Sequence, residues 1–342
     1  MVRAAASSGI EAVILFGPTA SGKSALAAAL ARRLNGVVVN ADALQLYRGL
    51  PILTAQPEPA LLARAPHRLY AVLDWRQRAS AGWWLRALEP LLAELRAAGR
   101  PAILVGGTGL YLRAAILGLA PTPPVPQAVT DHLRRRLEAE GPEALHAELA
   151  SRDPVAAARI TTADRQRILR ALAVLEATGI PLSRWQAEAE AEAPLGPAAR
   201  AGRVAAFVLW PDRTALYRRI DARFAAMMAA GALMEARALA AADLPPDLPV
   251  MKAVGVPPLL RHLSGGISLD EAMALAQRDS RRYAKRQFTW ARHQFAGWTR
   301  LPVALQHDEA AGLAGHAETL LAQAAADLRR WCAGRTGRRD GR

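Results

Sequence analysis

Short apolar runs alternate with helix-like patterns over the first third of the chain. The segment Ala12–Phe16 is entirely apolar and ends at a Gly-Pro pair, as a buried strand of a parallel sheet does. Leucines four residues apart predict a helix over Lys23–Leu34, and Val37–Val39 and Ala102–Val105 are further strand-like runs. Strands that alternate with helices predict an α/β core built on a parallel sheet.

The same alternation returns in the second half of the chain with longer helices. Ala205–Leu209 is a fourth strand-like run. Helical patterns cover three longer segments, Trp83–Ala98, Thr214–Ala242 and Ser268–Phe295. The last of these segments is strongly basic, so it is a candidate surface for an anionic partner.

The middle of the chain has helical patterns but no strand signal. The sequence PTPPVP at Pro121–Pro126 predicts a hinge, Thr130–Gly179 has a helical pattern, and Glu188–Gly202 predicts a second loop. This stretch is either a long helical excursion on the core or an inserted helical domain, and we favour the insertion. We expect core segments at 1–124 and 203–330, an insertion domain at 125–202 and a disordered basic tail at 331–342.

Composition narrows the possible classes of protein. Of 342 residues, 52% are hydrophobic and 22% are charged, which excludes a wholly disordered chain. The single cysteine, Cys332, excludes an internal disulfide and a cysteine-ligated zinc site, and we expect it on the surface. No apolar run reaches the ~18–20 residues of a membrane span, and no targeting signal is convincing, so we expect a cytoplasmic protein and, by default, a monomer.

The charge balance favours a polyanionic partner. The 44 basic and 30 acidic residues give a net charge of +14, which makes nucleic acid the first candidate. Almost all the basic residues are arginine, so compositional bias is the alternative explanation. The only lysines are Lys23, Lys252 and Lys285.

A phosphate-binding motif, G-x-x-x-x-G-K-[ST], lies between the first strand and the first helix. Its residues are Gly17, Pro18, Thr19, Ala20, Ser21, Gly22, Lys23 and Ser24. In such a loop the backbone N–H groups and the helix N-terminus attract phosphate oxygens, the lysine adds a charge, and the serine can ligate Mg²⁺. An ordinary strand–helix turn would not explain Lys23. The absence of an apolar strand ending in Asp weakens a nucleotide hydrolase but leaves a small-molecule kinase open.

A carboxylate, Asp42, follows the second strand. Residues just past the carboxyl end of a parallel strand face the ligand crevice, so Asp42 is expected near the phosphate loop. There it can hold a metal or act as a general base. The alternative is an aspartate that caps a helix or a turn.

Further motifs follow in a fixed order along the chain. They are Thr54–Pro57, Pro101–Tyr111 (PAILVGGTGLY), Gln166–Leu172, Leu216–Phe224, Met251–Gly255 and Tyr283–Trp290 (YAKRQFTW). With the phosphate loop and Asp42, the chain resembles the tRNA dimethylallyltransferases, or isopentenyl-tRNA transferases, over roughly Val13 to Phe295. The phosphate loop is shared with many proteins, whereas VGGTGLY and AKRQ-TW are far more specific.

The resemblance implies an α/β fold with a P-loop NTPase-like core, a parallel sheet flanked by helices, and an inserted all-helical domain. It implies transfer of a dimethylallyl group from dimethylallyl diphosphate to N6 of the adenosine immediately 3′ of the anticodon. Asp42 matches the family's base and Arg219 its diphosphate-contacting arginine, with Mg²⁺ near Ser24. Arg223 lies on the same helical face as Arg219 and can reach the same site. Without the resemblance, a solvated arginine face would be the preferred interpretation.

The resemblance also implies contacts with tRNA around a flipped-out base. The matching positions are Asp42, Ala43, Leu44, Gln45, Thr108, Thr130, Gln166, Arg167, Ile168, Leu169 and Arg170. We add Lys252, Lys285 and Arg286 as basic candidates, because Arg278, Arg281, Arg282, Lys285 and Arg286 form a stripe that can follow a phosphate backbone. Tyr283, Phe288 and Trp290 could stack on bases, although core packing is favoured for the last two. The insert corresponds to the domain that grips the anticodon stem.

The sequence departs from the family pattern at three places. Ala43 stands where the family usually has Ser, so a hydroxyl contact is lost. Val256-Pro257 follow Gly255, where an aromatic and a basic residue are usual. Thr130 stands where an arginine is common.

Three other functions stay open at this point. A prenyltransferase that acts on free adenylate shares the core chemistry, but the insert and the positive charge favour tRNA. A P-loop kinase or NTPase would consume ATP. A non-catalytic tRNA-binding protein would keep its biological activity without Asp42.

Overall fold

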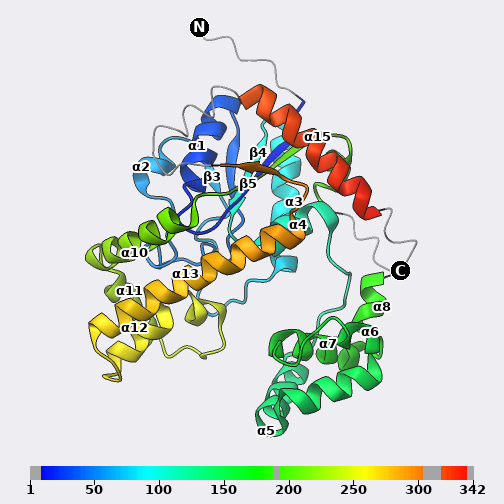
Figure 1. Ribbon diagram of the computed structural model, residues 1–342, viewed down its shortest axis with the longest axis vertical. Helices are drawn as coiled ribbons and strands as arrows, with labels where there is room; N and C mark the ends of the chain where they lie inside the picture. The colour runs from blue at the N-terminus through cyan, green and yellow to red at the C-terminus, as the bar shows by residue number, and fades with distance from the viewer. Residues whose placement is uncertain (1–8, 188–192, 303–316, 337–342) are drawn as a thin grey trace. The chain divides into compact units, whose positions relative to one another are not determined.

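In the described residues, six parallel strands form one sheet in the order β3-β2-β4-β1-β5-β6, with helices packed around it (Figure 1). The computed structural model describes residues 9–187, 193–302 and 317–336. The strands are β1 (Ala12–Phe16), β2 (Val37–Asn40), β3 (His67–Arg68), β4 (Ala102–Gly106), β5 (Val204–Leu209) and β6 (Thr299–Leu301). The predicted α/β core is confirmed, but the two edge strands, β3 and β6, were not predicted from the sequence.

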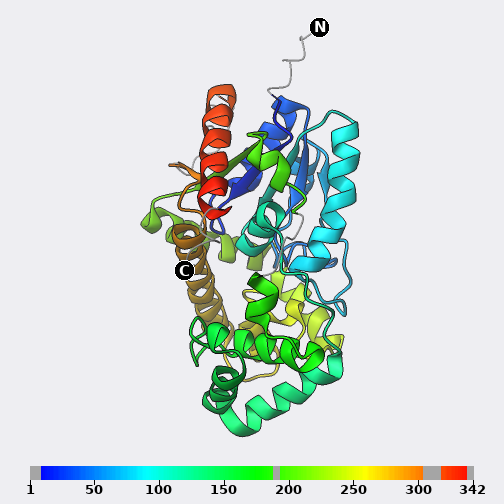
Figure 2. The ribbon, with the colours of Figure 1, turned by 90° about the vertical axis from the view of Figure 1, so that its right-hand side faces the viewer.

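Helices cover both faces of the sheet. On one face, α1 (Lys23–Leu34) and α15 (Ala317–Thr336) pack against alternate strand residues such as Val13, Leu15 and Phe207. On the opposite face lies α3 (Ala81–Ala97), as Figure 2 shows. Trp84 of α3 stacks on Tyr111 of α4 (Gly109–Leu117), with ring centroids 5.1 Å apart. Both faces are apolar, which explains the continuous apolar runs in the strands.

A group of helices follows β5 along the chain. It comprises α10 (Arg213–Ala229), α11 (Ala232–Ala241), η1 (Pro249–Lys252), α12 (Val256–Leu263) and α13 (Leu269–Gln294). The helices α10 and α13 run side by side (Figure 1). Among the described residues no single helix is long and apolar enough to cross a membrane, although the bent pair α10–α11 passes by length and composition.

The single helix predicted over 214–242 is wrong, because the chain bends between α10 and α11. Gly231 has φ +108°, in the left-handed region that favours glycine, and it caps α11. The apolar periodicity continues across this bend, so the pattern alone does not reveal it. Two short helices lie earlier in the chain: α2 (Pro59–Leu62) between β2 and β3, and α9 (Gly196–Arg200) directly before β5.

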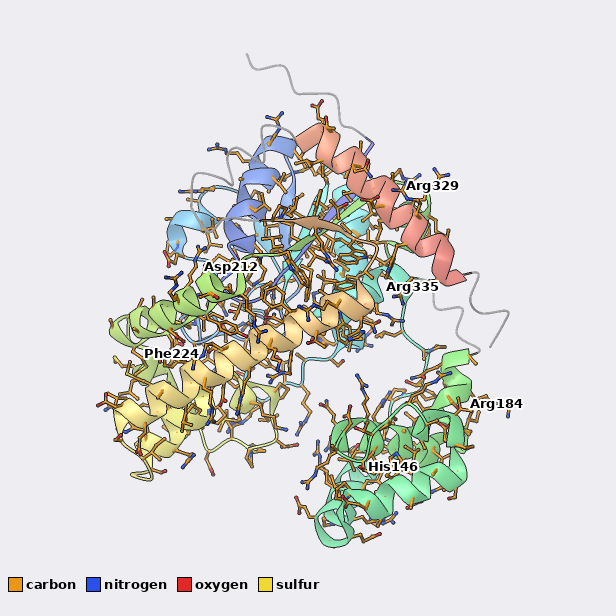
Figure 3. All side chains as sticks on the ribbon, in the orientation of Figure 1. His146, Arg184, Asp212, Phe224, Arg329 and Arg335 are labelled. Carbon is orange, nitrogen blue, oxygen red and sulfur yellow. The ribbon has the colours of Figure 1, made fainter. Side chains whose placement is uncertain are left out.

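A second compact unit spans Leu117–Ala193, between the two parts of the first unit. It contains α5 (Gln127–Arg152), α6 (Pro154–Ala157), α7 (Arg165–Thr178) and α8 (Leu182–Ala187). Leu133, Leu145 and Ile168 are fully buried in its core. His146, labelled in Figure 3, lies with Nε2 2.7 Å from the carbonyl of Ile160. Residues 194–202, expected in the insert, pack with the first unit instead.

The two segments of the first unit that flank the insert are hydrogen-bonded to each other. The N–H of Leu195 donates to the carbonyl of Ala115 at 2.8 Å. The segments before and after the insert are therefore held together at its base.

The expected disordered tail at 331–342 is wrong over 331–336, which form the last part of α15. Trp331 packs edge-on against Trp298, with ring centroids 5.9 Å apart. Cys332, expected on the surface, is buried with 3% of its area exposed. The apolar pair Trp331-Cys332 keeps the helix on the core, and the remaining tail, 337–342, lies outside the described residues.

Candidate active site at the phosphate loop

The phosphate loop wraps tightly between β1 and α1. Ala20 and Gly22 have φ +62° and +84°, which turns the backbone inward. A Cβ on Gly17 would lie 2.8 Å from the Ser21 hydroxyl oxygen. That oxygen is buried without a hydrogen-bond partner in the described part of the chain, and Gly22 provides no side-chain cap for α1. The loop therefore offers polar groups for an anion.

Lys23 is half-buried at the start of α1, and its Nζ donates to the carbonyl of Pro18 at 3.4 Å. Burial lowers the pKa of Lys23 to about 8; nearby Asp42 opposes this shift and nearby Arg223 adds to it. A phosphate beside the ammonium would restore the charged form. The sequence-predicted residues Lys23, Asp42 and Arg223 thus belong to one electrostatic group.

Asp42 lies two residues after the end of β2 and caps a turn. Its Oδ1 accepts the N–H of Leu44 at 3.1 Å. Its Oδ2 accepts no hydrogen bond from the described residues. The turn-capping alternative is therefore correct for one oxygen, while the other is free for chemistry.

Leu44 and Gln45 are half-buried, and the side chain of Gln45 reaches the next motif along the chain. The side-chain amide of Gln45 donates to the carbonyls of Ala55 at 2.8 Å and of Thr54 at 3.1 Å. Two motifs singled out in the sequence, the one at Asp42 and the one at Thr54–Pro57, are therefore joined by this amide. Leu44 gives its N–H to Asp42.

A glycine turn after β4 packs against the Asp42 loop. A Cβ on Gly106 would lie 2.1 Å from the carbonyl oxygen of Ala41, so only glycine fits there. The Thr108 hydroxyl accepts the N–H of Ala43 at 3.0 Å. Tyr283 hydrogen-bonds Thr108, and its pKa is raised, first by burial and then by Asp42. Since Ala43 contributes its backbone, the missing serine hydroxyl does not prevent this contact.

The predicted arginine pair lies on α10. Arg219 and Arg223 are half-buried, whereas Arg218 is exposed. Burial, followed by Arg219, lowers the pKa of Arg223, and Glu58 and Asp42 oppose the shift. The charge of Arg219 thus disfavours the charged form of its neighbour Arg223, and such a pair of guanidinium groups is suited to a multiply charged anion. Asp212 caps the start of α10 and Phe224 is buried beyond the pair; both are labelled in Figure 3.

Three arginines of the basic stripe on α13 lie beside carboxylates, and the other two cations are exposed. Arg281 is ion-paired with Asp221 of α10, and Arg278 and Arg282 lie 3.4 and 3.7 Å from the carboxylate of Asp279. Lys285 and Arg286 are exposed, as is Lys252 in η1. The guanidinium of Arg286 lies 5.6 Å from the ring centre of Tyr283.

The aromatic residues of α13 differ in their exposure. Phe288 is buried edge-on against Trp210, with centroids 4.9 Å apart, so the preference for core packing is confirmed. Trp290 packs against Gly109, where a Cβ would lie 2.1 Å from the indole nitrogen. Neither ring is a free stacking platform. Tyr283 is half-buried.

The remaining predicted contact residues lie in the second unit. Gln166 and Arg167 are exposed, and Arg167 lies 3.3 Å from Asp164. Arg170 donates to the Thr122 hydroxyl at 2.8 Å. Ile168 is fully buried in the core of this unit, so its side chain is not available to a partner. Thr130 and Leu169 are half-buried.

Two buried amides, Asn40 and Gln287, have no assigned role in the sequence interpretation. Their exposed areas are 0% and 4%. Buried amides need partners, so each marks a hydrogen-bonded junction. The signal in the sequence is weak: Asn40 ends an apolar strand, and Gln287 lies inside the motif AKRQ-TW.

Comparison with protein families shows to which family the chain belongs. Residues 45–294 match the IPP transferase model, and residues 10–78 match the isopentenyl transferase model. The chain belongs to the IPP transferase family. This IPP transferase is 54% identical over 284 residues to a tRNA dimethylallyltransferase of Nitrobacter hamburgensis, covering 83% of this chain and 88% of the relative. It is 56% identical over 283 residues to one of Rhodopseudomonas palustris, covering 83% and 86%.

Solved structures agree with this assignment. The tRNA isopentenylpyrophosphate transferase of Bacillus halodurans has a TM-score of 0.64 and 30% identity, covering 94% of this chain and 99% of its own. A eukaryotic dimethylallyltransferase acting on tRNA shares the fold with a TM-score of 0.75 at 23% identity, covering 90% and 78%. The predicted family and the transferase class are confirmed.

Proposed function

We propose that this IPP transferase moves a dimethylallyl group from dimethylallyl diphosphate to N6 of the adenosine immediately 3′ of a tRNA anticodon, releasing diphosphate. The observation that carries the proposal is the electrostatic group formed by Lys23, Asp42 and Arg223. It combines a cationic phosphate cradle with a carboxylate that has a free oxygen. A leaving group and a base can therefore act at one centre.

The phosphate loop serves the donor. As the bond between the allylic carbon and the diphosphate oxygen breaks, negative charge develops on the diphosphate. The N–H groups at the start of α1, the Lys23 ammonium and the guanidinium groups of Arg219 and Arg223 lie where they can stabilise that charge.

Asp42 serves the acceptor. The adenine amine is a weak nucleophile because its lone pair is delocalised into the ring. As the new C–N bond forms, Oδ2 of Asp42 takes a proton from N6, while Oδ1 stays bound to the N–H of Leu44. The carboxylate is thus held in place by the turn that it caps.

The site fits a Mg²⁺ ion that arrives with the diphosphate. Ser24 is half-buried in the first turn of α1, beside the cradle. The described residues contain no cluster of three His, Cys, Asp or Glu side chains that would form a protein-only metal site. The ion would be held by the Ser24 hydroxyl and by phosphate oxygens, and it would supply charge neutralisation.

Exposed polar side chains of both units are assigned to the RNA. Lys252, Lys285 and Arg286 belong to the first unit, and Gln166, Arg167 and Arg170 belong to the insert, which we propose grips the anticodon stem. Thr108, Ala43, Leu44 and Gln45 are assigned to the target adenosine. We also propose a monomer, and a reducing cytoplasm, which the lone buried cysteine fits.

The test is a transfer assay with labelled dimethylallyl diphosphate, unmodified tRNA and Mg²⁺. Wild-type protein should place the label on the adenosine 3′ of the anticodon. Asp42→Asn keeps an acceptor for Leu44 but no base, and should lower the rate by about 100-fold or more. Asp212→Asn is the matched control, because asparagine caps a helix as well as aspartate does.

Two other outcomes would redirect the proposal. Label in AMP rather than tRNA would make the acceptor a free nucleotide. ATP consumption without any labelled acceptor would make the phosphate loop a kinase site.

A further inference from the structure

Gln287 of α13 bridges two loops of the site with its side-chain amide. Its Oε1 accepts the N–H of Thr19 in the phosphate loop at 2.9 Å, and its Nε2 donates to the carbonyl of Gly107 at 3.1 Å. The side chain is buried, with 4% of its area exposed. One amide thus joins the phosphate loop to the glycine turn after β4.

The glycine turn leads directly to the proposed base. Thr108 follows Gly107 and accepts the N–H of Ala43, the neighbour of Asp42. A Cβ on Gly107 would lie 3.4 Å from Oδ2 of Asp42 and 2.1 Å from Nε2 of Gln287. The amide of Gln287 is therefore packed beside the same turn as the free carboxylate oxygen.

The chemistry of this junction requires an amide. Thr19 presents a donor and Gly107 an acceptor, so the bridging group must offer one acceptor and one donor. A carboxylate would meet the carbonyl oxygen of Gly107 with negative charge, and an apolar side chain would leave both backbone groups unsatisfied in a buried place. Because the N–H of Thr19 is used by Gln287, it is not one of the donors available to the diphosphate.

We propose that Gln287 is a positioning residue that fixes the distance between the diphosphate cradle and the base. This inference rests on the proposed function. The cradle holds the leaving group, and the turn with Thr108 supports the loop of Asp42. In-line transfer needs these two ends at a set separation. Gln287 sets it from outside both loops, without touching either substrate.

The experiment compares two glutamines of α13. Gln287→Met keeps the volume and removes both hydrogen bonds. It should lower the single-turnover transfer rate about tenfold or more, at saturating tRNA and dimethylallyl diphosphate, with tRNA affinity within about twofold of wild type. Gln277→Met is the control, because among the described residues the side chain of Gln277 donates to the carbonyl of Asp221 alone, at 3.1 Å, and the variant should keep the wild-type rate.

Gln287→Glu gives a second test, in which one variant is compared with itself at different pH values. At high pH the introduced carboxylate repels the Gly107 carbonyl, and transfer should be slow. When protonated it again offers one donor and one acceptor, so the rate relative to wild type should rise as the pH falls from about 8 to about 6.

Three results would overturn the positioning role. The first is a Gln287→Met rate within about twofold of wild type. The second is a loss of tRNA affinity in proportion to the loss of rate, which would make Gln287 part of RNA binding. The third is a Gln287→Glu rate ratio that does not change with pH. Failure of the proposed function is separate, since wild-type protein would then label no tRNA.

Discussion

The buried side chain of Asn40 hydrogen-bonds both backbone polar groups of Asp42. Its Oδ1 accepts the N–H of Asp42 at 2.8 Å, and its Nδ2 donates to the carbonyls of Asp42 and Leu69, each at 3.0 Å. The carbonyl of Asn40 accepts the indole N–H of Trp84 at 2.7 Å. The loop that carries the proposed base is therefore fixed to β2 and to α3.

Asn40→Ala should destabilise the protein and slow the transfer. The partly buried backbone groups of Asp42 and Leu69 lose their partners, which costs up to about 1–3 kcal/mol for each group that water does not satisfy. Urea unfolding should show the loss in stability, and single-turnover assays should show a rate reduced by at least about tenfold. Asn35→Gly is the control, because the exposed Asn35 caps α1 with φ +51°, where glycine fits. An unchanged rate in Asn40→Ala would mean that Asp42 needs no such support.

Affinity for dimethylallyl diphosphate should fall as the pH rises through about 8, the pKa of Lys23. Above this pH the unliganded protein loses the ammonium charge, and binding must restore it. Isothermal titration from about pH 7 to about pH 9 should show a weaker dependence for Lys23→Met than for wild type. The ligand's own ionisation is the same in both proteins, so parallel pH curves would contradict the role of Lys23.

Lys23→Met should also raise stability near pH 7. The pKa of Lys23 is about 8 in the folded protein against the ordinary 10.5, so the unfolded chain binds more protons between these values. Stability from this group therefore rises with pH across that window, and below it the charged lysine destabilises the fold. The gain in melting temperature of Lys23→Met over wild type should shrink as the pH increases from about 8 to about 10. A constant difference would contradict the shift.

The exposed cations of α13 should set the salt dependence of tRNA binding. Lys285→Ala and Arg286→Ala should each reduce the slope of log Kd against log salt by about 0.7–0.9 if each contacts one phosphate. Arg32→Ala, an exposed arginine of α1, should leave the slope unchanged. Arg281→Ala should act on stability instead, because it leaves Asp221 without its ion-pair partner. Filter binding across a salt series distinguishes the two effects.

Cys332 should resist thiol reagents in the folded protein. Burial raises the pKa of its thiol to about 11, so little thiolate forms near neutral pH. Reaction with a chromogenic disulfide should be slow until denaturant is added. Cys332→Ser should leave the transfer rate unchanged and lower stability by about 1–3 kcal/mol, because it buries a hydroxyl. Fast labelling of the native protein would show that α15 does not stay packed.

Local sequence patterns were sufficient to predict the central strands of the sheet and the phosphate loop. The runs at Ala12–Phe16 and Ala102–Val105 are apolar because both sheet faces are covered. The strands β3 and β6 escaped prediction because two or three residues, such as His67-Arg68, carry no periodicity. They are strands only because β2 and β5 offer free edges.

The features that could not be predicted depend on contacts between residues far apart in the chain. Gln287 and Thr19 are 268 residues apart in the chain, so nothing in either local sequence reveals their hydrogen bond. Cys332 lies on α15, whose residue Trp331 meets Trp298 only when the helix packs beside β6, so its burial could not be predicted from the local sequence. The spacing of Arg219 and Arg223 predicts that they share one face of α10. The ion pair that neutralises Arg281 could not be predicted in this way, because its partner Asp221 lies on a different helix.

The position of β1 between β4 and β5 affects how the chain folds during its synthesis. β4 leaves the ribosome before the insert, and β5 leaves it afterwards, so one edge of β1 stays unpaired while the whole insert is translated. An unpaired, fully apolar strand is prone to aggregate. The hydrogen bond between Leu195 and Ala115 holds the chain where β5 follows, so we expect prompt folding of the insert to shorten the time for which this edge of β1 is exposed.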